Sequence, residues 1–284
     1  MTASTVNAEQ IEYWNARTGE RWAQDQQLLD RQIQPLGAEA MQALAPAAGE
    51  RVLDIGCGCG QTTLELAQRV GRGGLVLGAD ISRPMLAVAR ARPLPAGGSI
   101  SFRELDAQTA DLAAAADIAS FDAAFSRFGV MFFSDPAAAF ANIRRSLRPG
   151  GRLAFVCWRS LAENDWMRKP LEAAKPLLPS LPPPDPTAPG PFAFADAQRV
   201  TALLGKSGFE SVTLRPFDAL IGGGDLQQTL ALTLRIGPLG SVLREHPELT
   251  DAVAEKVRVV LEPHDTPQGV LLPGAVWIVT ARNP

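Results

Sequence analysis

The chain has 284 residues, of which 46% are hydrophobic and 20% charged, and its formal net charge of -3 goes with an isoelectric point near 5.5. This length allows one elaborated domain with a sizeable core, and the acidic balance argues against DNA or RNA as a substrate, because it offers no general attraction to a phosphate backbone. No apolar run reaches the ~18 residues of a membrane span, and the N-terminus lacks a signal-peptide pattern. The three cysteines give no disulfide framework. We therefore expect a soluble protein of the cytoplasm that does not enter a membrane.

Residues 1–35 are polar with interspersed aromatic residues, and we expect them to form helices. Tyr13 and Trp22 stand among glutamines and acidic residues, with few aliphatic side chains nearby. Such helices are poor core elements, so their aromatic side chains need a surface to cover.

A glycine-rich turn follows the first predicted strand, within Arg51–Thr63. The apolar run at its start predicts a buried parallel strand, and Gly56, Gly58 and Gly60 allow a sharp turn that brings the backbone close to a ligand. The next helix would present its free N–H groups and positive dipole end at the same place. Gln61 stands where a G-x-G-x-x-G dinucleotide fingerprint needs its third glycine, which weakens a nicotinamide interpretation.

The next two predicted strands are each followed by a carboxylate. Leu75–Ala79 leads into Asp80, and Ser99–Arg103 is followed closely by Asp106. A carboxylate at the tip of the second strand is placed to accept hydrogen bonds from both hydroxyls of a ribose bound over the first turn. The fourth and fifth predicted strands are Phe121–Phe125 and Arg152–Trp158.

The order of these motifs resembles the class I S-adenosylmethionine-dependent methyltransferases. The motifs are Asp54-x-Gly56-x-Gly58-x-Gly60, Asp80, Leu105-Asp106-Ala107, Phe121-Asp122-Ala123-Ala124-Phe125 and Leu147-Arg148-Pro149-Gly150-Gly151. Within that class the chain looks most like the small-molecule branch that includes the ubiquinone and menaquinone methylases. The resemblance covers residues 10–160 best, and it implies an α/β, Rossmann-like sheet of seven strands flanked by helices, with an antiparallel last strand inserted between strands five and six.

The resemblance also implies a cofactor, S-adenosylmethionine, with S-adenosylhomocysteine as product. A cofactor-binding core is expected over residues 46–160, covered by the N-terminal helices. The implied cofactor residues are Tyr13, Trp22, Arg31, Asp54, Gly56, Cys57, Gly58, Gly60, Asp80, Ile81, Met85, Asp106, Ala107 and Ser126.

Several of these residues have an expected partner on the cofactor. By this resemblance Tyr13 and Trp22 line the sulfonium, Arg31 pairs with the methionyl carboxylate, and Asp106 accepts from the adenine amino group. The alternative for the tryptophans is that they only pack their helix on the sheet. No metal site is expected, because no cluster of Cys and His with metal spacing accompanies Cys57.

The loop after the fourth strand is where this family places the methyl group and its acceptor. It contains no acidic residue, which argues against a catechol-type metal site. Arg127 in this loop is a candidate for steering an anionic substrate, or alternatively a structural arginine.

The C-terminal half departs from the minimal fold. Residues 175–194 are rich in proline and predict an extended connection. Strands six and seven are predicted over Ser211–Phe217 and Ala275–Ala281, and the 218–274 insertion between them carries two helical stripes of leucine and valine. We expect these helices to cap the substrate pocket; a homodimer contact is the alternative.

The predicted function is methyl transfer from S-adenosylmethionine to a small-molecule acceptor by in-line displacement, mainly through positioning. If the acceptor must lose a proton, His264 of the insertion is the candidate general base; otherwise it is an ordinary surface residue. Two alternatives are a nicotinamide-dependent oxidoreductase and a catalytically idle nucleoside-binding or scaffold protein.

Overall fold

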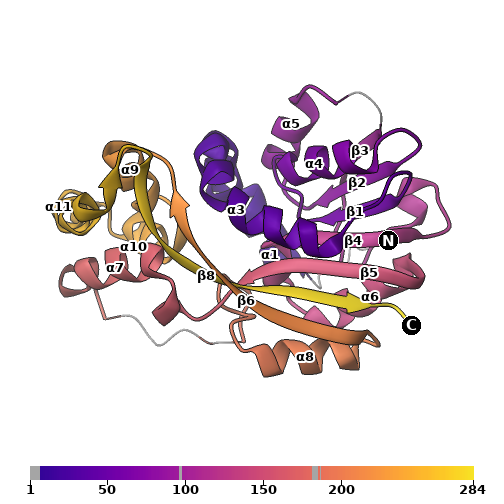
Figure 1. Cartoon of the computed structure of the whole chain (residues 1–284). Coiled ribbons are helices and arrows are strands. Elements are labelled where there is room, and N and C mark those ends of the chain that lie inside the picture. Colours follow the sequence, from indigo (N-terminus) through magenta and orange to yellow (C-terminus); the bar gives the residue numbers. More distant parts are fainter. Residues whose placement is uncertain (1–6, 96–97, 181–184, 186) are drawn as a thin grey trace.

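The computed structural model describes residues 7–95, 98–180, 185 and 187–284. Seven strands follow one another across a sheet in the order β3-β2-β1-β4-β5-β8-β6 (Figure 1). They are β1 (Arg51–Ile55), β2 (Leu75–Asp80), β3 (Ser99–Glu104), β4 (Phe121–Arg127), β5 (Leu147–Trp158), β6 (Glu210–Gly222) and β8 (Gly269–Arg282). The last strand, β8, is antiparallel to both of its neighbours, β5 and β6. The predicted Rossmann-like fold is therefore confirmed, with one addition, the two-residue strand β7 (Asp265–Thr266) that pairs with β8.

Helices cover both faces of this sheet, as its central strands require. The strands β1, β2, β4 and β5 are buried over most of their length, so neither face of the sheet can remain open to water. Figure 1 shows α3 (Gln26–Leu44), α4 (Gln61–Val70) and α5 (Arg83–Ala91) on one face, and α6 (Pro136–Ser146) and α8 (Ala197–Lys206) on the other.

The N-terminal segment forms α1 (Ala8–Asn15), α2 (Arg17–Gln24) and the first turns of α3. Helix α3 runs unbroken through Pro35 to Leu44, beyond the boundary expected at residue 35, and its apolar side lies on the sheet. The joint between α1 and α2 is fastened to the tip of β2, where Asn15 Nδ2 donates to the Ile81 carbonyl over 2.8 Å and Ser82 Oγ donates to the Trp14 carbonyl over 2.8 Å. These contacts hold the N-terminal helices at the carboxyl edge of the sheet.

The insertion between the last two long strands is shorter than predicted. Because β6 continues to Gly222 and β8 begins at Gly269, the insertion covers residues 223–268 rather than 218–274. It contains three helices rather than two, namely α9 (Leu226–Thr233), α10 (Gly237–Glu245) and α11 (Thr250–Leu261). The sequence did not predict α10, because two glycines and a proline in its first turns hide the helical pattern.

The insertion and α7 (Asp165–Ala174) form a lobe beside the sheet (Figure 1). The predicted apolar stripes are buried within this lobe: Leu230, Val253 and Val257 pack in one cluster with Ala174 of α7 and Val270 of β8. Because the chain itself covers these stripes, they do not by themselves require a dimer contact.

The proline-rich connection predicted over 175–194 is only partly described, since residues 181–184 and 186 lie outside the described residues. Its last residue, Phe194, is anchored in the main core, with its ring centroid 5.9 Å from Phe140 and 6.2 Å from Phe155. This end of the connection is therefore fixed to the sheet.

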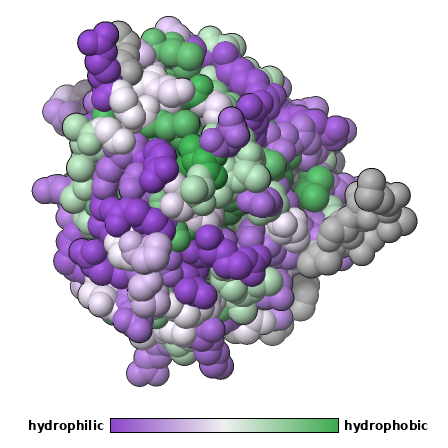
Figure 2. Space-filling view, turned by 90° about the vertical axis from the view of Figure 1, so that its right-hand side faces the viewer, coloured by the Kyte–Doolittle hydropathy of each residue, from purple (hydrophilic) through white to green (hydrophobic). Residues whose placement is uncertain are grey.

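The surface carries both hydrophilic and hydrophobic residues. On the face shown in Figure 2, hydrophilic residues surround a smaller group of hydrophobic ones. Within the described ranges, no helix combines the length and apolar character needed to cross a membrane.

Candidate active site

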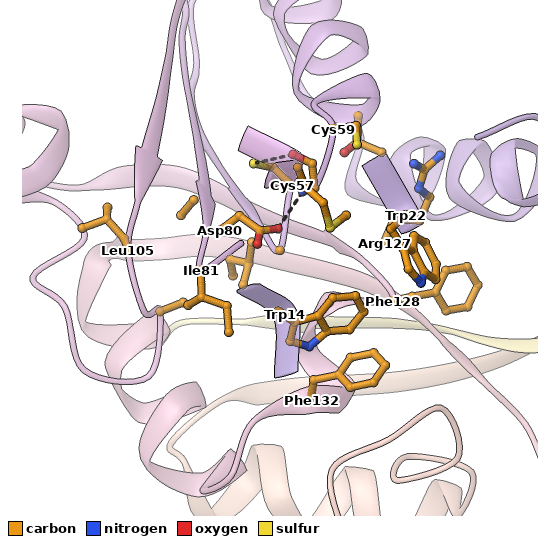
Figure 3. Close-up of a pocket in the computed structure, with 18 of the residues that line it drawn as sticks. Trp14, Trp22, Cys57, Cys59, Asp80, Ile81, Leu105, Arg127, Phe128 and Phe132 are labelled. Carbon is orange, nitrogen blue, oxygen red and sulfur yellow. Dashed lines mark hydrogen bonds between the residues drawn. The ribbon is translucent and has the colours of Figure 1, made fainter. Parts of the chain in front are cut away.

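A pocket of about 120 Å³ lies where the carboxyl ends of the parallel strands meet the N-terminal helices. Figure 3 shows Asp80, Ile81 and Leu105 on one side of it and Trp22, Arg127 and Phe128 on the other. Most of the predicted cofactor residues line it: Trp22, Gly56, Cys57, Gly58, Asp80, Ile81, Met85, Asp106 and Ala107. The structure thus brings together residues that lie far apart in the sequence.

The turn after β1 approaches the pocket through its backbone. Gly56 and Gly58 have φ angles of +64° and +53°, in the left-handed region that favours glycine. A Cβ added to Gly56 would lie 2.8 Å from the Cα of Gly129, so a side chain there would force the backbone to move. Gly60, with φ +84°, precedes α4 and faces Phe102 rather than the pocket, so its predicted contact with a cofactor is replaced by a role in shaping the turn.

Asp54 supports the turn from behind and does not line the pocket. Its side chain is fully buried, and Oδ2 accepts from the hydroxyls of Thr62 at 2.7 Å and Thr63 at 2.6 Å. Burial raises the pKa of this carboxyl to about 6. Ser126 is likewise buried outside the pocket, where its hydroxyl donates to the Ile55 carbonyl at 2.7 Å and ties β4 to β1. Both were predicted as cofactor residues, and the structure places both in the scaffold.

Asp80 lies at the tip of β2 on the pocket wall. Its Oδ2 accepts from the backbone N–H of Gly58 at 2.7 Å (Figure 3), and its Oδ1 accepts from that of Ser82 at 2.8 Å. Burial raises the pKa of this carboxyl, although both backbone hydrogen bonds act in the opposite direction. Each oxygen keeps a further lone pair, so the oriented carboxylate can still accept hydrogen bonds from a ligand.

A second acidic residue of the pocket wall, Asp106, is held by its own loop. Its Oδ1 accepts from the Gln108 N–H at 2.9 Å, and Asn142 Nδ2 donates to the Ala107 carbonyl at 2.9 Å. Asn7 also lines the pocket, and its buried Oδ1 has no hydrogen-bond partner among the described residues. This oxygen is therefore free to accept a hydrogen bond from water or from a ligand in the pocket.

The side of the pocket opposite Leu105 carries an ion pair. The Arg127 guanidinium lies 2.8 Å from Asp30 Oδ1, and Arg92 lies 2.6 Å from Asp30 Oδ2. Arg127 also donates to Gln61. Both Asp30 and Arg127 line the pocket, with side chains only 15% and 11% exposed.

Arg31, predicted to bind the methionyl carboxylate, lies elsewhere. It is exposed, and its Nη1 donates to the Gly223 carbonyl at 2.7 Å, outside the pocket. The neighbouring residue Asp30 faces inward because successive residues of a helix point about 100° apart.

The same shift of one position occurs in α1. Tyr13 does not line the pocket and is 40% exposed, whereas Trp14 lines it beside Trp22, with ring centroids 5.9 Å apart. Trp14 also meets Phe132 edge-on at 5.0 Å. The aromatic side chains expected over the ligand are therefore Trp14 and Trp22, and Tyr13 belongs to an adjoining cavity.

This second cavity, of about 240 Å³, lies between the N-terminal helices and the lobe of α7, α9 and α10. It shares six residues with the first pocket: Trp14, Trp22, Leu29, Ile33, Phe128 and Phe132. Beyond them the wall continues through Trp158, which stacks on Phe128 with centroids 4.3 Å apart. The two cavities are thus neighbours across an aromatic and aliphatic border.

His264 lines neither cavity. Its Nε2 lies 2.9 Å from Nζ of Lys169, and partial burial together with this ammonium lowers the pKa of the imidazole. The residue predicted as a general base is therefore placed in the outer lobe. The described residues also contain no group of three or more His, Cys, Asp or Glu side chains arranged to hold a metal ion.

Sequence reasoning missed Asn7, Trp14, Asp30, Phe128 and Phe132 on the pocket wall. For Trp14 the signal was present, since it adjoins the predicted Tyr13 and only the helix face was misjudged. For Asp30 the local sequence gives no signal, because its partners Arg92 and Arg127 come from distant elements.

Comparison with known proteins agrees with this geometry. A family profile described as "Methyltransferase domain" matches residues 52–151. The chain is 38% identical to aklanonic acid methyltransferase of Streptomyces sp. (strain C5) over 123 residues, which is 43% of this chain and 54% of that protein. It is 30% identical to the ubiquinone biosynthesis O-methyltransferase of Ralstonia nicotianae over 158 residues, 55% of this chain and 64% of that protein. These matches span less than two thirds of either relative.

Among solved structures, a phosphoethanolamine N-methyltransferase 2 of Haemonchus contortus, in complex with phosphomonomethylethanolamine and S-adenosylhomocysteine, superposes with a TM-score of 0.55. The superposition covers 99% of this chain and 61% of the other, at 17% identity. At this identity the similarity concerns the fold alone.

Proposed function

The chain carries a class I S-adenosylmethionine-dependent methyltransferase domain, akin to the ubiquinone and menaquinone methylases, and we propose that it transfers a methyl group from this cofactor to a small-molecule acceptor. The observation that carries the proposal is the pairing of two cavities. One is lined by the glycine turn and three acidic residues, Asp30, Asp80 and Asp106, and the other is largely apolar and shares its aromatic wall. A donor and an acceptor bound side by side would meet at that wall.

In this proposal Asp80 accepts from the ribose hydroxyls and Asp106 from the adenine amino group, while Ala107 offers its backbone N–H. Ile81 and Met85 complete the apolar part of this end, with Asn7 as a further acceptor. The residues fit an adenosine, because the pocket wall contains carboxylates for its polar groups and apolar side chains for its base.

We assign the amino-acid end of the cofactor to Arg127 and Asp30, in place of Arg31. An α-amino acid carries one positive and one negative group, and this ion pair offers one partner for each: the guanidinium for the carboxylate and the Asp30 carboxylate for the ammonium. Figure 3 supports this orientation of the cofactor, since Arg127 lies across the pocket from Asp80 and Leu105. Trp14 and Trp22 offer aromatic faces that favour a positively charged sulfonium.

The bound cofactor supplies an activated methyl group. What the chain contributes is placement: an in-line reaction needs the nucleophile about 3 to 3.5 Å from the methyl carbon, with water excluded. The aromatic border of Trp14, Phe128 and Phe132 provides a dry contact between the two sites. We do not retain His264 as a base, because it lines neither cavity.

The oxidoreductase alternative has no support from the comparisons or from the turn, whose third glycine is replaced by Gln61. The idle-protein alternative predicts cofactor binding without transfer. We further propose that the enzyme works in the cytoplasm without nucleic acid; the three cysteines, which are buried and free, fit a reducing compartment.

Calorimetry with S-adenosylmethionine and NAD, followed by incubation of the methyl-labelled cofactor with a panel of phenols, acids, amines and thiols, tests the proposal. We expect binding of S-adenosylmethionine, no binding of NAD, and label in an extractable small molecule. Binding without transfer to any compound would favour the idle protein, and absence of binding would contradict both.

A further inference from the structure

The wall of the second cavity contains almost no charge. Among the thirty described residues that line it there is no Asp, Glu, Lys, Arg or His. Its polar side chains are all neutral at pH 7: Tyr13, Gln32, Thr229, Thr233 and Ser241. A charged ligand group held here would lose its water without gaining a counter-charge from the wall, which is costly.

The remainder of the wall is aromatic and aliphatic. Trp158 lies between Phe128 and Trp166, with ring centroids 4.3 Å and 4.9 Å away, and Trp14 and Trp22 form the border with the first pocket. Aromatic faces of this kind pack well against flat ring systems.

Of these five polar side chains, only Thr229 and Ser241 have a hydrogen-bond partner among the described residues. Thr229 Oγ1 donates to the Gly224 carbonyl at 3.2 Å, and Ser241 Oγ accepts from Arg244 at 2.7 Å. Gln32 on α3 and Thr233 at the end of α9 make no side-chain hydrogen bond to another described residue, although both line the cavity and are half-buried. They come from the two sides of the cavity, one from the N-terminal helices and one from the insertion.

We propose that this cavity is the acceptor site and that it takes an uncharged, flat ring compound, whose hydroxyl or carbonyl groups hydrogen-bond to Gln32 and Thr233. The inference rests on the methyl-transfer function proposed above and adds the class of the acceptor. It makes Gln32 and Thr233 specificity-determining residues, and it excludes acceptors whose body carries phosphate, carboxylate or ammonium groups.

Two probes with the same rings isolate the charge: 2-hydroxyanthracene, which is neutral at pH 7, and anthracene-2-carboxylic acid, which is an anion. Four of the five tryptophans of the chain, Trp14, Trp22, Trp158 and Trp166, line the cavity, so quenching of tryptophan emission reports binding there. The titrations use the full chain, both free and with S-adenosylhomocysteine. We expect the hydroxy probe to bind at least about tenfold more tightly than the carboxylate.

A positive charge placed on the wall should remove the preference for the neutral probe. Gln32→Lys should raise the affinity for the carboxylate probe at least about tenfold. The matched control is Gln34→Lys, the same change two residues further along α3 at an exposed position outside this cavity, and it should leave both affinities within twofold. Thr233→Val should weaken the hydroxy probe alone.

Equal binding of the two probes to the unaltered chain would overturn the inference, as would the absence of binding by the hydroxy probe or equal gains from Gln32→Lys and Gln34→Lys. Each of these results can occur with methyl transfer intact, in which case only the acceptor class is wrong. If instead S-adenosylhomocysteine fails to bind, the proposed function is contradicted. The comparison of the two probes on the free chain then still decides whether the second cavity prefers a neutral ring compound to an anionic one.

Discussion

Replacing Asp80 by alanine tests the assignment of the ribose site most directly. In the structure this carboxylate is fixed by the N–H groups of Gly58 and Ser82, at 2.7 Å and 2.8 Å, so it is oriented before any ligand arrives. Hydrogen bonds to a charged acceptor contribute about 1.5 to 3 kcal/mol each when lost, and part of the loss of two is recovered by water. We therefore expect Asp80→Ala to weaken S-adenosylhomocysteine binding by about 2 kcal/mol, which is roughly 30-fold in the dissociation constant.

The control comes from the neighbouring strand. Glu104 pairs in register with Asp80 across β2 and β3, but its side chain is 48% exposed and does not line the pocket. Glu104→Ala should change the affinity less than twofold. Because Asp80→Ala also leaves two backbone donors unpaired, Asp80→Asn is measured beside it, and circular dichroism establishes that each variant is folded. Unchanged affinity in calorimetry of a folded Asp80→Ala chain would refute the ribose assignment.

Three further predictions concern the ion pair, the buried turn and the outer lobe. Arg127→Met should lower the affinity for S-adenosylhomocysteine about tenfold or more and leave that for adenosine within twofold, since adenosine lacks the amino-acid end; equal losses for both ligands in calorimetry would contradict the role. Asp54 has a pKa raised from 3.8 to about 6, so between these values the native chain binds more protons than the unfolded chain and stability falls as pH rises. Urea unfolding at several pH values measures the difference in free energy of unfolding between the unaltered chain and Asp54→Asn. From pH 4 to pH 7 this difference should change by up to about 3 kcal/mol, against the unaltered chain. A change in favour of the unaltered chain would contradict the raised pKa of Asp54. His264→Ala should alter turnover less than about threefold at every pH, and a loss of about 10² relieved at high pH would restore the general base.

The sequence predicted the parts of the fold and site that depend on local patterns. The glycine turn follows β1, Asp80 ends β2 and Asp106 comes two residues after β3, and parallel strands necessarily bring their carboxyl ends to one edge. Two residues of the same motifs, Asp54 and Gly60, lie outside the pocket wall. A motif marks the turn as a whole and does not tell which of its residues face the pocket.

Features formed by contacts between distant segments were not predictable in this way. Asp30 becomes part of the pocket only because Arg92 and Arg127 converge on it from the end of α5 and the end of β4. Likewise Tyr13 and Trp14 differ by one position, and the face that α1 turns inward is set by its anchoring at Ile81 and Ser82 rather than by its own weak apolar pattern.

The long pairing of β6 with β8 has a consequence for how this enzyme can diversify. The ladder continues from Glu210 and Arg282 at one end to Gly222 and Leu271 at the other, and Val270 N–H still donates to the Gly224 carbonyl at 2.8 Å beyond it. The two ends of the insertion are therefore already closed by the sheet, and the entropic cost of joining them grows only slowly with the length of chain in between. Residues 225–268 therefore form a segment that can be exchanged for another. Under the proposed function, such an exchange would present a new wall to the acceptor and leave the residues proposed to bind the methyl donor unchanged.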